Sequence, residues 1–275
     1  MRKSLFSVLL FFTASCFGIN QTGRLDHNGL FTILEHYKKI AGNWHRGDLL
    51  DHMVWVSKSM DQMFENNSWW LHGIDSSERR LMVLSAFMHD IGKAGDLEFE
   101  YRVKRTHPLV GFEYILGKRP FYISENETWN VQEWLEHHEL TDYEIKTLAV
   151  LVGMHQELGK VLFAFKNAPS KWASVQEKFF DTLLYYVQES GYNNGIPDER
   201  IIIMCAAICR SDGEGLHYVN YESKTFPELP NLPEKHEAHR PIPVSLVDVF
   251  GIPFFFYRFL PYCLKKAEEL KTVSE

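Results

Sequence analysis

An imidazole and a carboxylate stand side by side at His89-Asp90, at the end of an apolar, helix-like run. A glycine and a lysine, Gly92 and Lys93, follow almost at once. Neutral imidazole and carboxylate are ligands of borderline and hard divalent metals. Because neighbouring residues of a helix point about 100° apart, one metal can hold both side chains only where other ligands converge on it. The pair therefore predicts partner ligands elsewhere in the chain.

Further histidines and aspartates have the right type and placement to be those partners. Each lies on, or at the end of, a helix-like segment, so its side chain can be aimed into the core of a helical bundle. They are His52, His107, His155 and Asp212. A first metal would be held by His52, His89, Asp90 and Asp212, and a second by His107 and His155.

The order of these residues resembles the HD superfamily of metal-dependent phosphohydrolases, over about residues 30 to 215. The stretch 89–93, His-Asp-Ile-Gly-Lys, is similar to the central motif of that superfamily in full. Residues 107–113, His-Pro-Leu-Val-Gly-Phe-Glu, look like the segment in which a histidine opens the next helix. Residues 144–155 are similar to the helix that presents a further histidine. The resemblance implies an all-α fold: an HD-domain-like helical bundle with a metal site in its core.

A second candidate for the later histidine ligand lies in residues 136–140, Glu-His-His-Glu-Leu. This run resembles the His-His-Glu element of the cyclic-dinucleotide phosphodiesterase branch, and its distance from His107 fits that branch. The Gly-Tyr-Pro signature that should follow is replaced by Thr-Asp-Tyr at 141–143. We favour His155, because its helix has the better apolar register, and interpret His137 and His138 as a polar helix end.

Such a site predicts hydrolytic chemistry. A metal held by carboxylate and imidazole lowers the pKa of bound water and polarises a phosphoryl oxygen. We therefore expect hydrolysis of a phosphate ester, either a nucleotide or a related small phosphoester, with one or two divalent ions such as Mn, Mg or Fe. Asp90 is expected to bridge the metals as a catalytic residue. Lys93 is expected to bind a substrate phosphate oxygen and to offset developing negative charge.

Two other functions would use the same residues. An HD-type di-iron oxygenase has a similar ligand set with a redox-active metal, and tightly bound iron with oxygen uptake would identify it. A non-catalytic regulatory module on the same scaffold would bind nucleotides without releasing phosphate. Lys93 favours hydrolysis over oxygenation, and the presence of every expected ligand type argues against a decayed site.

The elements that must position these residues are helices, which apolar periodicity predicts after residue 24. The first is expected over 49–63 and carries His52. The second is expected over 79–88, with Ser76 as its cap and Gly92 past its end. Others are expected over 110–116, with Pro108 in the first turn, and over 131–138, 142–155, 175–190, 199–209 and 264–270. Thr141 or Asp142 caps the 142–155 helix. Asp212 is expected to follow the 199–209 helix, and no strand pattern of useful length competes.

Composition sets the domain organisation and the partners. A chain of 275 residues, 45% of them apolar, supports one substantial core or two small domains. We expect one HD-type domain over 25–226, followed over 227–275 by a proline-rich segment and a terminal helix that packs on it. With a net charge of −7 and no long basic run, no extended nucleic-acid surface is expected, while a small charged substrate is compatible with this balance. Cys205 and Cys209 are interpreted as buried free thiols.

The first residues, 1–18, have the pattern of a secretory signal peptide. Arg2-Lys3 precedes an apolar stretch, and Cys16 and Gly18 are the small residues before a cleavage point. The stretch is shorter than the ~20 apolar residues of a transmembrane helix, so no membrane span is expected in the mature chain. The pattern favours export to the periplasm or the medium. The alternative is a cytoplasmic protein in which these residues pack on the fold.

Overall fold

The computed structural model describes residues 49–66, 68–93, 106–124, 127–167, 169–215 and 255–274. These residues are mostly helical, so the expected predominance of helix is confirmed. The predicted signal peptide at 1–18 and the predicted proline-rich segment lie outside the described residues. Within the described part of the chain, none of the helices combines the length and the apolar character needed to cross a membrane.

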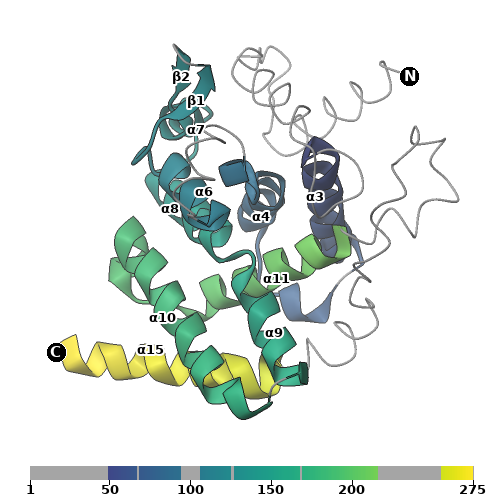
Figure 1. Cartoon of the computed structure of the whole chain (residues 1–275), viewed down its shortest axis with the longest axis vertical. Helices are drawn as coiled ribbons and strands as arrows, with labels where there is room; N and C mark the ends of the chain where they lie inside the picture. Colours follow the sequence, from purple (N-terminus) through teal and green to yellow (C-terminus); the bar gives the residue numbers. More distant parts are fainter. Residues whose placement is uncertain are drawn as a thin grey trace, which may run out of the picture.

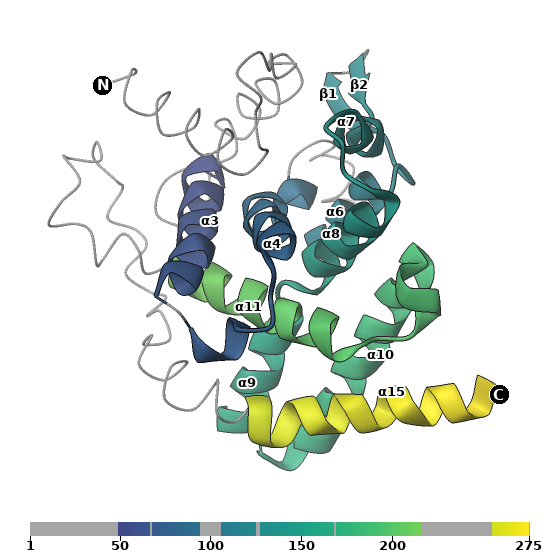
Figure 2. The same cartoon turned by 180° about the vertical axis from the view of Figure 1, so that it is seen from behind.

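Five helices surround the main core. They are α3 (Leu49–Glu65), α4 (Ser76–Met88), α6 (His107–Ile115), α8 (Asp142–Met154) and α11 (Glu199–Gly215). Helices α3 and α4 lie side by side, α6 packs on α8, and α11 crosses beneath α3 and α4 (Figures 1 and 2). Apolar side chains such as Met53, Met82 and Leu151 are fully buried between them. This burial is the main force that holds the helices in place.

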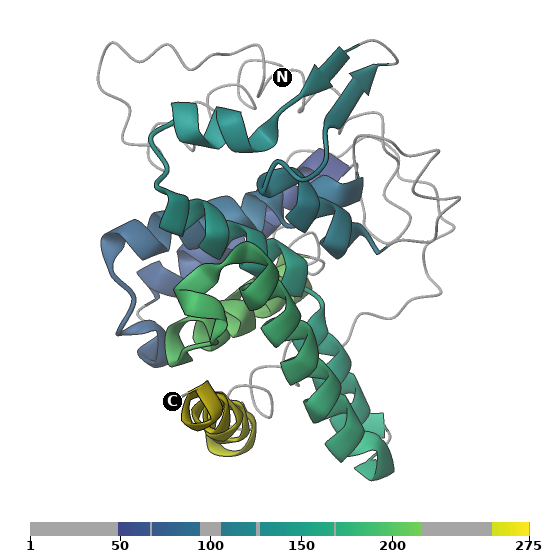
Figure 3. The same ribbon diagram turned by 90° about the vertical axis from the view of Figure 1, so that its left-hand side faces the viewer.

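A second group of helices extends the molecule away from this core. Helices α9 (Glu157–Asn167) and α10 (Trp172–Ser190) run side by side, with the short η3 turn (Pro169–Lys171) between them (Figure 3). The π-helical turn η7 (Phe255–Phe259) leads into α15 (Leu260–Ser274), which packs on α11. The rings of Phe179 and Phe259 meet at a centroid distance of 4.7 Å. Aromatic packing thus joins η7, the turn that leads into α15, to α10.

A short antiparallel hairpin, β1 (Phe121–Ser124) with β2 (Glu127–Trp129), precedes α7 (Val131–His137). No strand pattern of useful length was expected, and these two strands have only four and three residues. The strands are too short to give an alternating pattern, and aromatic packing holds them instead. Phe121 pairs with Trp129 across the hairpin, and their rings lie 5.7 Å apart. Trp129 in turn contacts Trp134 of α7, with ring centroids 5.5 Å apart.

Helices α4 and α8 are built alike. Each has 13 residues and begins with a capping box. The cap of α4 is Asp75, which corrects the predicted Ser76, because the Asp75 carboxylate accepts from two backbone N–H groups of the first turn. The cap of α8 is Thr141, one of the two predicted residues. The two starts are linked, since the Ser77 hydroxyl donates to the Glu144 carboxylate at 3.2 Å.

Helix α11 is longer than predicted. It continues to Gly215, so Asp212 lies within its last turns and does not follow it. The polar run after Cys209 suggested an end, but the buried Ser211 hydroxyl donates to the Ile208 carbonyl at 2.9 Å within the helix. Helix α9, which follows α8 after a two-residue turn, was not predicted. The remaining short turns are η1 (Trp69–Leu71), η2 (Ile91–Lys93) and η4 (Tyr192–Gly195).

Candidate metal centre

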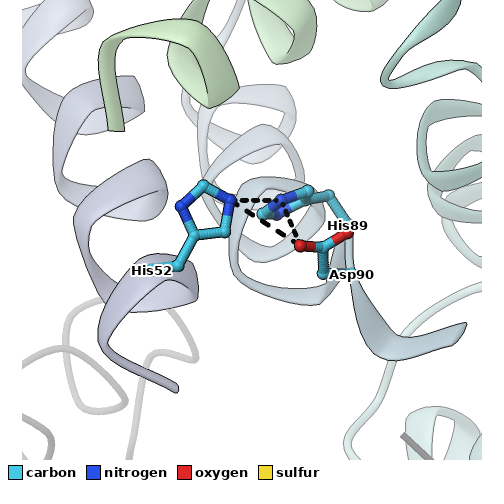
Figure 4. Close-up of side chains that lie close together, drawn as sticks. All are labelled: His52, His89 and Asp90. Carbon is cyan, nitrogen blue, oxygen red and sulfur yellow. Dashed lines mark hydrogen bonds and ion pairs between the residues drawn. The ribbon is translucent and has the colours of Figure 1, made fainter. Parts of the chain in front are cut away.

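The first ligand group joins α3, the end of α4 and α11. His52 points from α3 toward His89 and Asp90, as Figure 4 shows. His52 Nε2 lies 3.1 Å from His89 Nε2 and 3.1 Å from Asp212 Oδ1. His89 Nε2 lies 3.3 Å from Asp90 Oδ2 and 3.5 Å from Asp212 Oδ1. Two imidazoles and two carboxylates therefore direct their ligand atoms at one point.

The second ligand group lies on the other oxygen of Asp90. Asp90 Oδ1 is 3.0 Å from Nε2 of His107, the first residue of α6. It is 3.6 Å from Nε2 of His155, which follows α8. The two histidine Nε2 atoms are 3.2 Å apart. Each carboxylate oxygen of Asp90 thus faces a different group of histidines.

These distances fit metal coordination. Two ligands that are each about 2.1 Å from one metal lie roughly 3 to 3.5 Å from each other. Within the described residues, three groups of histidine and aspartate have all their ligand atoms within 4.8 Å of one another. Every one of these groups contains His89 or Asp90. The buried histidines and aspartates could therefore hold a metal ion.

The ring orientation of two of the histidines follows from their position at helix ends. His89 and His155 are the C-caps of α4 and α8. Each donates its Nδ1–H to a backbone carbonyl three residues earlier, Ala86 and Val152, at 2.7 Å. This bond orients the ring and turns Nε2 toward the cluster. The helix C-termini also carry partial negative charge, which favours a cation between them.

The charges of the first group are strongly coupled. Burial lowers the pKa of His89, but the carboxylates of Asp90 and Asp212 outweigh burial and raise it to about 10. Burial raises the pKa of Asp212, but hydrogen bonds with His52 and His89 hold it well below its usual range. The two aspartates therefore carry negative charge that demands a cation nearby.

The second group has the opposite electrostatics. Burial lowers the pKa of His155, and the neighbouring rings of His89 and His107 lower it further, to about 3. His155 is therefore neutral at physiological pH, which is the form that binds metals. No proton has to leave its ring before a metal can bind.

Lys93 of η2 lies directly beside the shared carboxylate. Its ammonium is 2.6 Å from Asp90 Oδ2, the oxygen that also faces His52 and His89. Asp90 is 1% exposed, whereas the Lys93 side chain is 22% exposed. His107, at 22%, and Asp212, at 20%, are the other partly exposed members of the cluster. Lys93, His107 and Asp212 are therefore the members of the cluster that solvent reaches.

A close backbone contact positions His107 against the His89-Asp90 turn. A Cβ atom added to Gly92 would lie only 1.9 Å from the His107 carbonyl oxygen. Gly111, one turn further along α6, is packed in the same way against Ile91 and Val152. Glycine at both positions lets η2 approach α6 and brings Asp90 within reach of His107.

All six residues expected as ligands are brought together by the structure. His137 and His138, the alternatives for the later histidine ligand, are not in these groups. His137 is exposed, and His138 donates its Nδ1–H to the Trp134 carbonyl at 2.7 Å and lies against the Trp134 ring. One polar neighbour was not expected: the Gln156 amide nitrogen lies 3.1 Å from His107 Nε2. Its only sequence signal is its place next to His155.

Comparison of the chain with protein-family models, with curated proteins and with solved structures finds no match.

Proposed function

We propose that this chain is a metal-dependent phosphohydrolase built on an HD-domain-like helical bundle, and that its substrate is a nucleotide or a related small phosphoester. The observation that carries the proposal is the position of Asp90. Its two oxygens face two separate groups of histidines, and a lysine ammonium lies against the same carboxylate. A carboxylate shared in this way is suited to bridge a pair of metal ions, and a cation beside it is suited to an anionic substrate.

The donor set supports particular metals. His52, His89, Asp90 and Asp212 would hold the first ion, and Asp90, His107 and His155 the second. Imidazoles together with carboxylates suit Mn²⁺ or Fe²⁺, whereas Mg²⁺ prefers oxygen ligands throughout. When bound, such ions polarise a phosphoryl oxygen and lower the pKa of a water molecule.

The residues of the chain provide the rest of the chemistry. The buried rings of His52, His89 and His155 keep bulk water from the inner side of the cluster. Lys93 has a partly exposed side chain that can turn from Asp90 toward a phosphate oxygen. Its positive charge would then offset the negative charge that develops on the phosphoryl group. The same lysine favours hydrolysis over oxygenation, because hydrolysis of a phosphoester always brings a phosphoryl group to the cluster, whereas oxygenation does not require one.

A phosphoester screen tests the proposal. The purified chain, loaded in turn with Mn²⁺, Mg²⁺ and Fe²⁺, should release phosphate or nucleoside from at least one class of small phosphoester. Asp90→Asn, measured in parallel, should release none. Tightly bound iron with oxygen uptake and no phosphate release would refute hydrolysis. Nucleotide binding without turnover under every metal would instead point to a regulatory module.

A further inference from the structure

Gln156 lies at the junction of α8 and α9, immediately after His155. Its backbone carbonyl accepts a hydrogen bond from the Lys160 N–H at 3.3 Å, which ties the junction to the first turn of α9. The side chain is half-buried, and its amide nitrogen lies 3.1 Å from His107 Nε2. The side chain of Gln156 is therefore held at the edge of the second ligand group, next to a partly exposed histidine.

Two groups face the same ring nitrogen of His107. Asp90 Oδ1 can only accept from Nε2, whereas the amide nitrogen of Gln156 can only donate, so the contact with Gln156 requires the Nε2 lone pair. The ring proton is then on Nδ1, which leaves Nε2 in the form that a metal requires. The same Nε2 lies 3.0 Å from Asp90 Oδ1 and 3.2 Å from His155 Nε2. Gln156 thus donates to the lone pair that a second metal would use.

A metal on His107 would leave the Gln156 amide without this acceptor. A half-buried N–H group with no acceptor is costly, so a new oxygen atom within its reach is favoured. His107 and Lys93 are both partly exposed, at 22% each, and both lie against the carboxylate of Asp90. An anionic substrate that enters there would present oxygen atoms to both side chains.

We propose that Gln156 is a substrate-binding residue. When the metals and the phosphoester are bound, its amide N–H donates to a phosphoryl oxygen instead of to His107 Nε2. The inference rests on the proposed function, since it needs a phosphate group beside His107. It adds a neutral donor to the charged contact made by Lys93. Because Gln156 acts on the substrate and not on the metals, its loss should weaken phosphate binding and leave metal binding intact.

The experiment compares Gln156→Leu and Gln156→Glu with the wild-type full chain, all loaded with Mn²⁺. Leucine keeps the bulk of the side chain without its donor, and glutamate replaces the donor with a negative acceptor. Gln132→Leu is the matched control, because the Gln132 amide also donates one hydrogen bond, to Glu136 on the exposed face of α7. Bound metal per chain, the Kd for inorganic phosphate and the melting temperature are measured for each.

Gln156→Leu should keep the wild-type metal content and weaken phosphate binding about tenfold, the usual effect of losing one hydrogen bond to a charged group. Gln156→Glu should weaken it further, by repulsion, and Gln132→Leu should change neither quantity. With any phosphoester that the wild type hydrolyses, KM should rise by about the same factor and kcat should change less.

Wild-type phosphate affinity in Gln156→Leu or Gln156→Glu would overturn the inference. So would loss of metal from Gln156→Leu, because the residue would then be a ligand. A wild type that binds phosphate but hydrolyses no phosphoester refutes the proposed function alone, and the comparison of phosphate affinities still tests Gln156.

Discussion

Asp90 is the residue on which both ligand groups depend. Its side chain is 1% exposed, and its two oxygens lie 3.3 Å from His89 Nε2 and 3.0 Å from His107 Nε2. Asp212 Oδ1, by contrast, lies 3.1 Å from His52 Nε2 and 3.5 Å from His89 Nε2, both in the first ligand group. The two aspartates should therefore affect metal binding differently, although both are carboxylates in the same cluster.

Asp90→Asn should abolish binding of both metals and all hydrolysis, because the amide removes the negative charge and one oxygen that the two groups share. Asp212→Asn should remove only the first ion, and His155→Ala only the second. Metal per chain, counted after gel filtration, measures this. The affinity of the affected site should fall by more than about 100-fold, which exceeds the loss expected for a residue that only orients a ligand. Asp90→Asn chains that keep one full equivalent of metal would refute the bridge.

Lys93 is an internal competitor for the metal. Its ammonium lies 2.6 Å from Asp90 Oδ2, and two like charges about 4 Å apart repel by about 4 kcal/mol near a protein surface. The side chain can swing partly into solvent, which relieves most of this repulsion. Lys93→Met should therefore bind Mn²⁺ about tenfold more tightly than the wild type, while losing affinity for phosphate. Competition with a metal-sensitive dye measures the first effect.

Two control variants test whether the gain in Mn²⁺ affinity depends on the charge and on the position of Lys93. Lys93→Arg keeps the charge and should not gain affinity for Mn²⁺. Lys146→Met removes a surface ammonium that lies at the same 2.6 Å from a carboxylate, that of Asp142, and should bind Mn²⁺ as the wild type does. Weaker Mn²⁺ binding by Lys93→Met would show that the lysine supports the metal site and does not compete with it.

At the scale of the elements, α4 and α8 act as a matched pair. Their starts are joined by the hydrogen bond from Ser77 to Glu144, and each has 13 residues. Two packed helices of equal length that start together and run in the same direction also end together. Their C-caps, His89 and His155, accordingly meet with ring centroids 5.0 Å apart. Equal length thus places one histidine of each ligand group beside the other.

The contact between η2 and α6 gives a test of how His107 is positioned. Gly92→Ala would place a methyl group 1.9 Å from the His107 carbonyl oxygen, so the start of α6 must move. We expect a loss of about 1 to 3 kcal/mol in the free energy of unfolding, and a second metal site weakened more than the first. Denaturant titration and metal counting measure the two effects.

Gly73→Ala is the control for this substitution, because an added Cβ atom at Gly73 has no neighbour within 4 Å. It should leave the free energy of unfolding almost unchanged. An equal loss of both metals in Gly92→Ala would show that the glycine holds the whole cluster and not His107 in particular.

The start of α8 should be sensitive to acid. Partial burial raises the pKa of Glu144, but hydrogen bonds from Thr141 and Ser77 and the charge of Arg80 hold it below the ordinary value of 4.5. A carboxyl whose pKa is lowered by folding stabilises the folded state above its unfolded pKa, and this contribution disappears as the pH falls through the folded pKa. Glu144→Gln should therefore be less stable than the wild type at neutral pH, by about 0.5 to 1 kcal/mol.

This difference should shrink when urea unfolding is repeated below pH 4.5, the ordinary pKa of the glutamate. The wild type loses the carboxylate there, and the variant has none to lose. A difference that stays constant with pH would mean that the hydrogen-bond geometry of the capping box matters and its charge does not.

At the scale of the whole molecule, periodicity in the sequence predicted the helices that carry the ligands, because each buries one apolar face. It misplaced the cap of α4, which a preceding aspartate provides, and the end of α11, where a buried serine lets the helix continue. It missed α9, which follows α8 with no proline to mark the break. The hairpin and Gln156 could not be predicted, since aromatic contacts and the contact with His107 exist only in the folded chain.

Metal binding should stabilise the whole fold, because the ligands come from α3, α6 and α11 and from the ends of α4 and α8, and unfolding disperses them. A metal that binds only the native state adds about 2.7 kcal/mol at 100 times its Kd. For a chain of this size that raises the Tm by roughly 5 to 10 °C. Differential scanning fluorimetry with Mn²⁺ should show this rise, and a chelator should reverse it. If Asp90→Asn gained as much Tm as the wild type, the metal would bind elsewhere, and the cluster around Asp90 would not be the centre that holds these helices together.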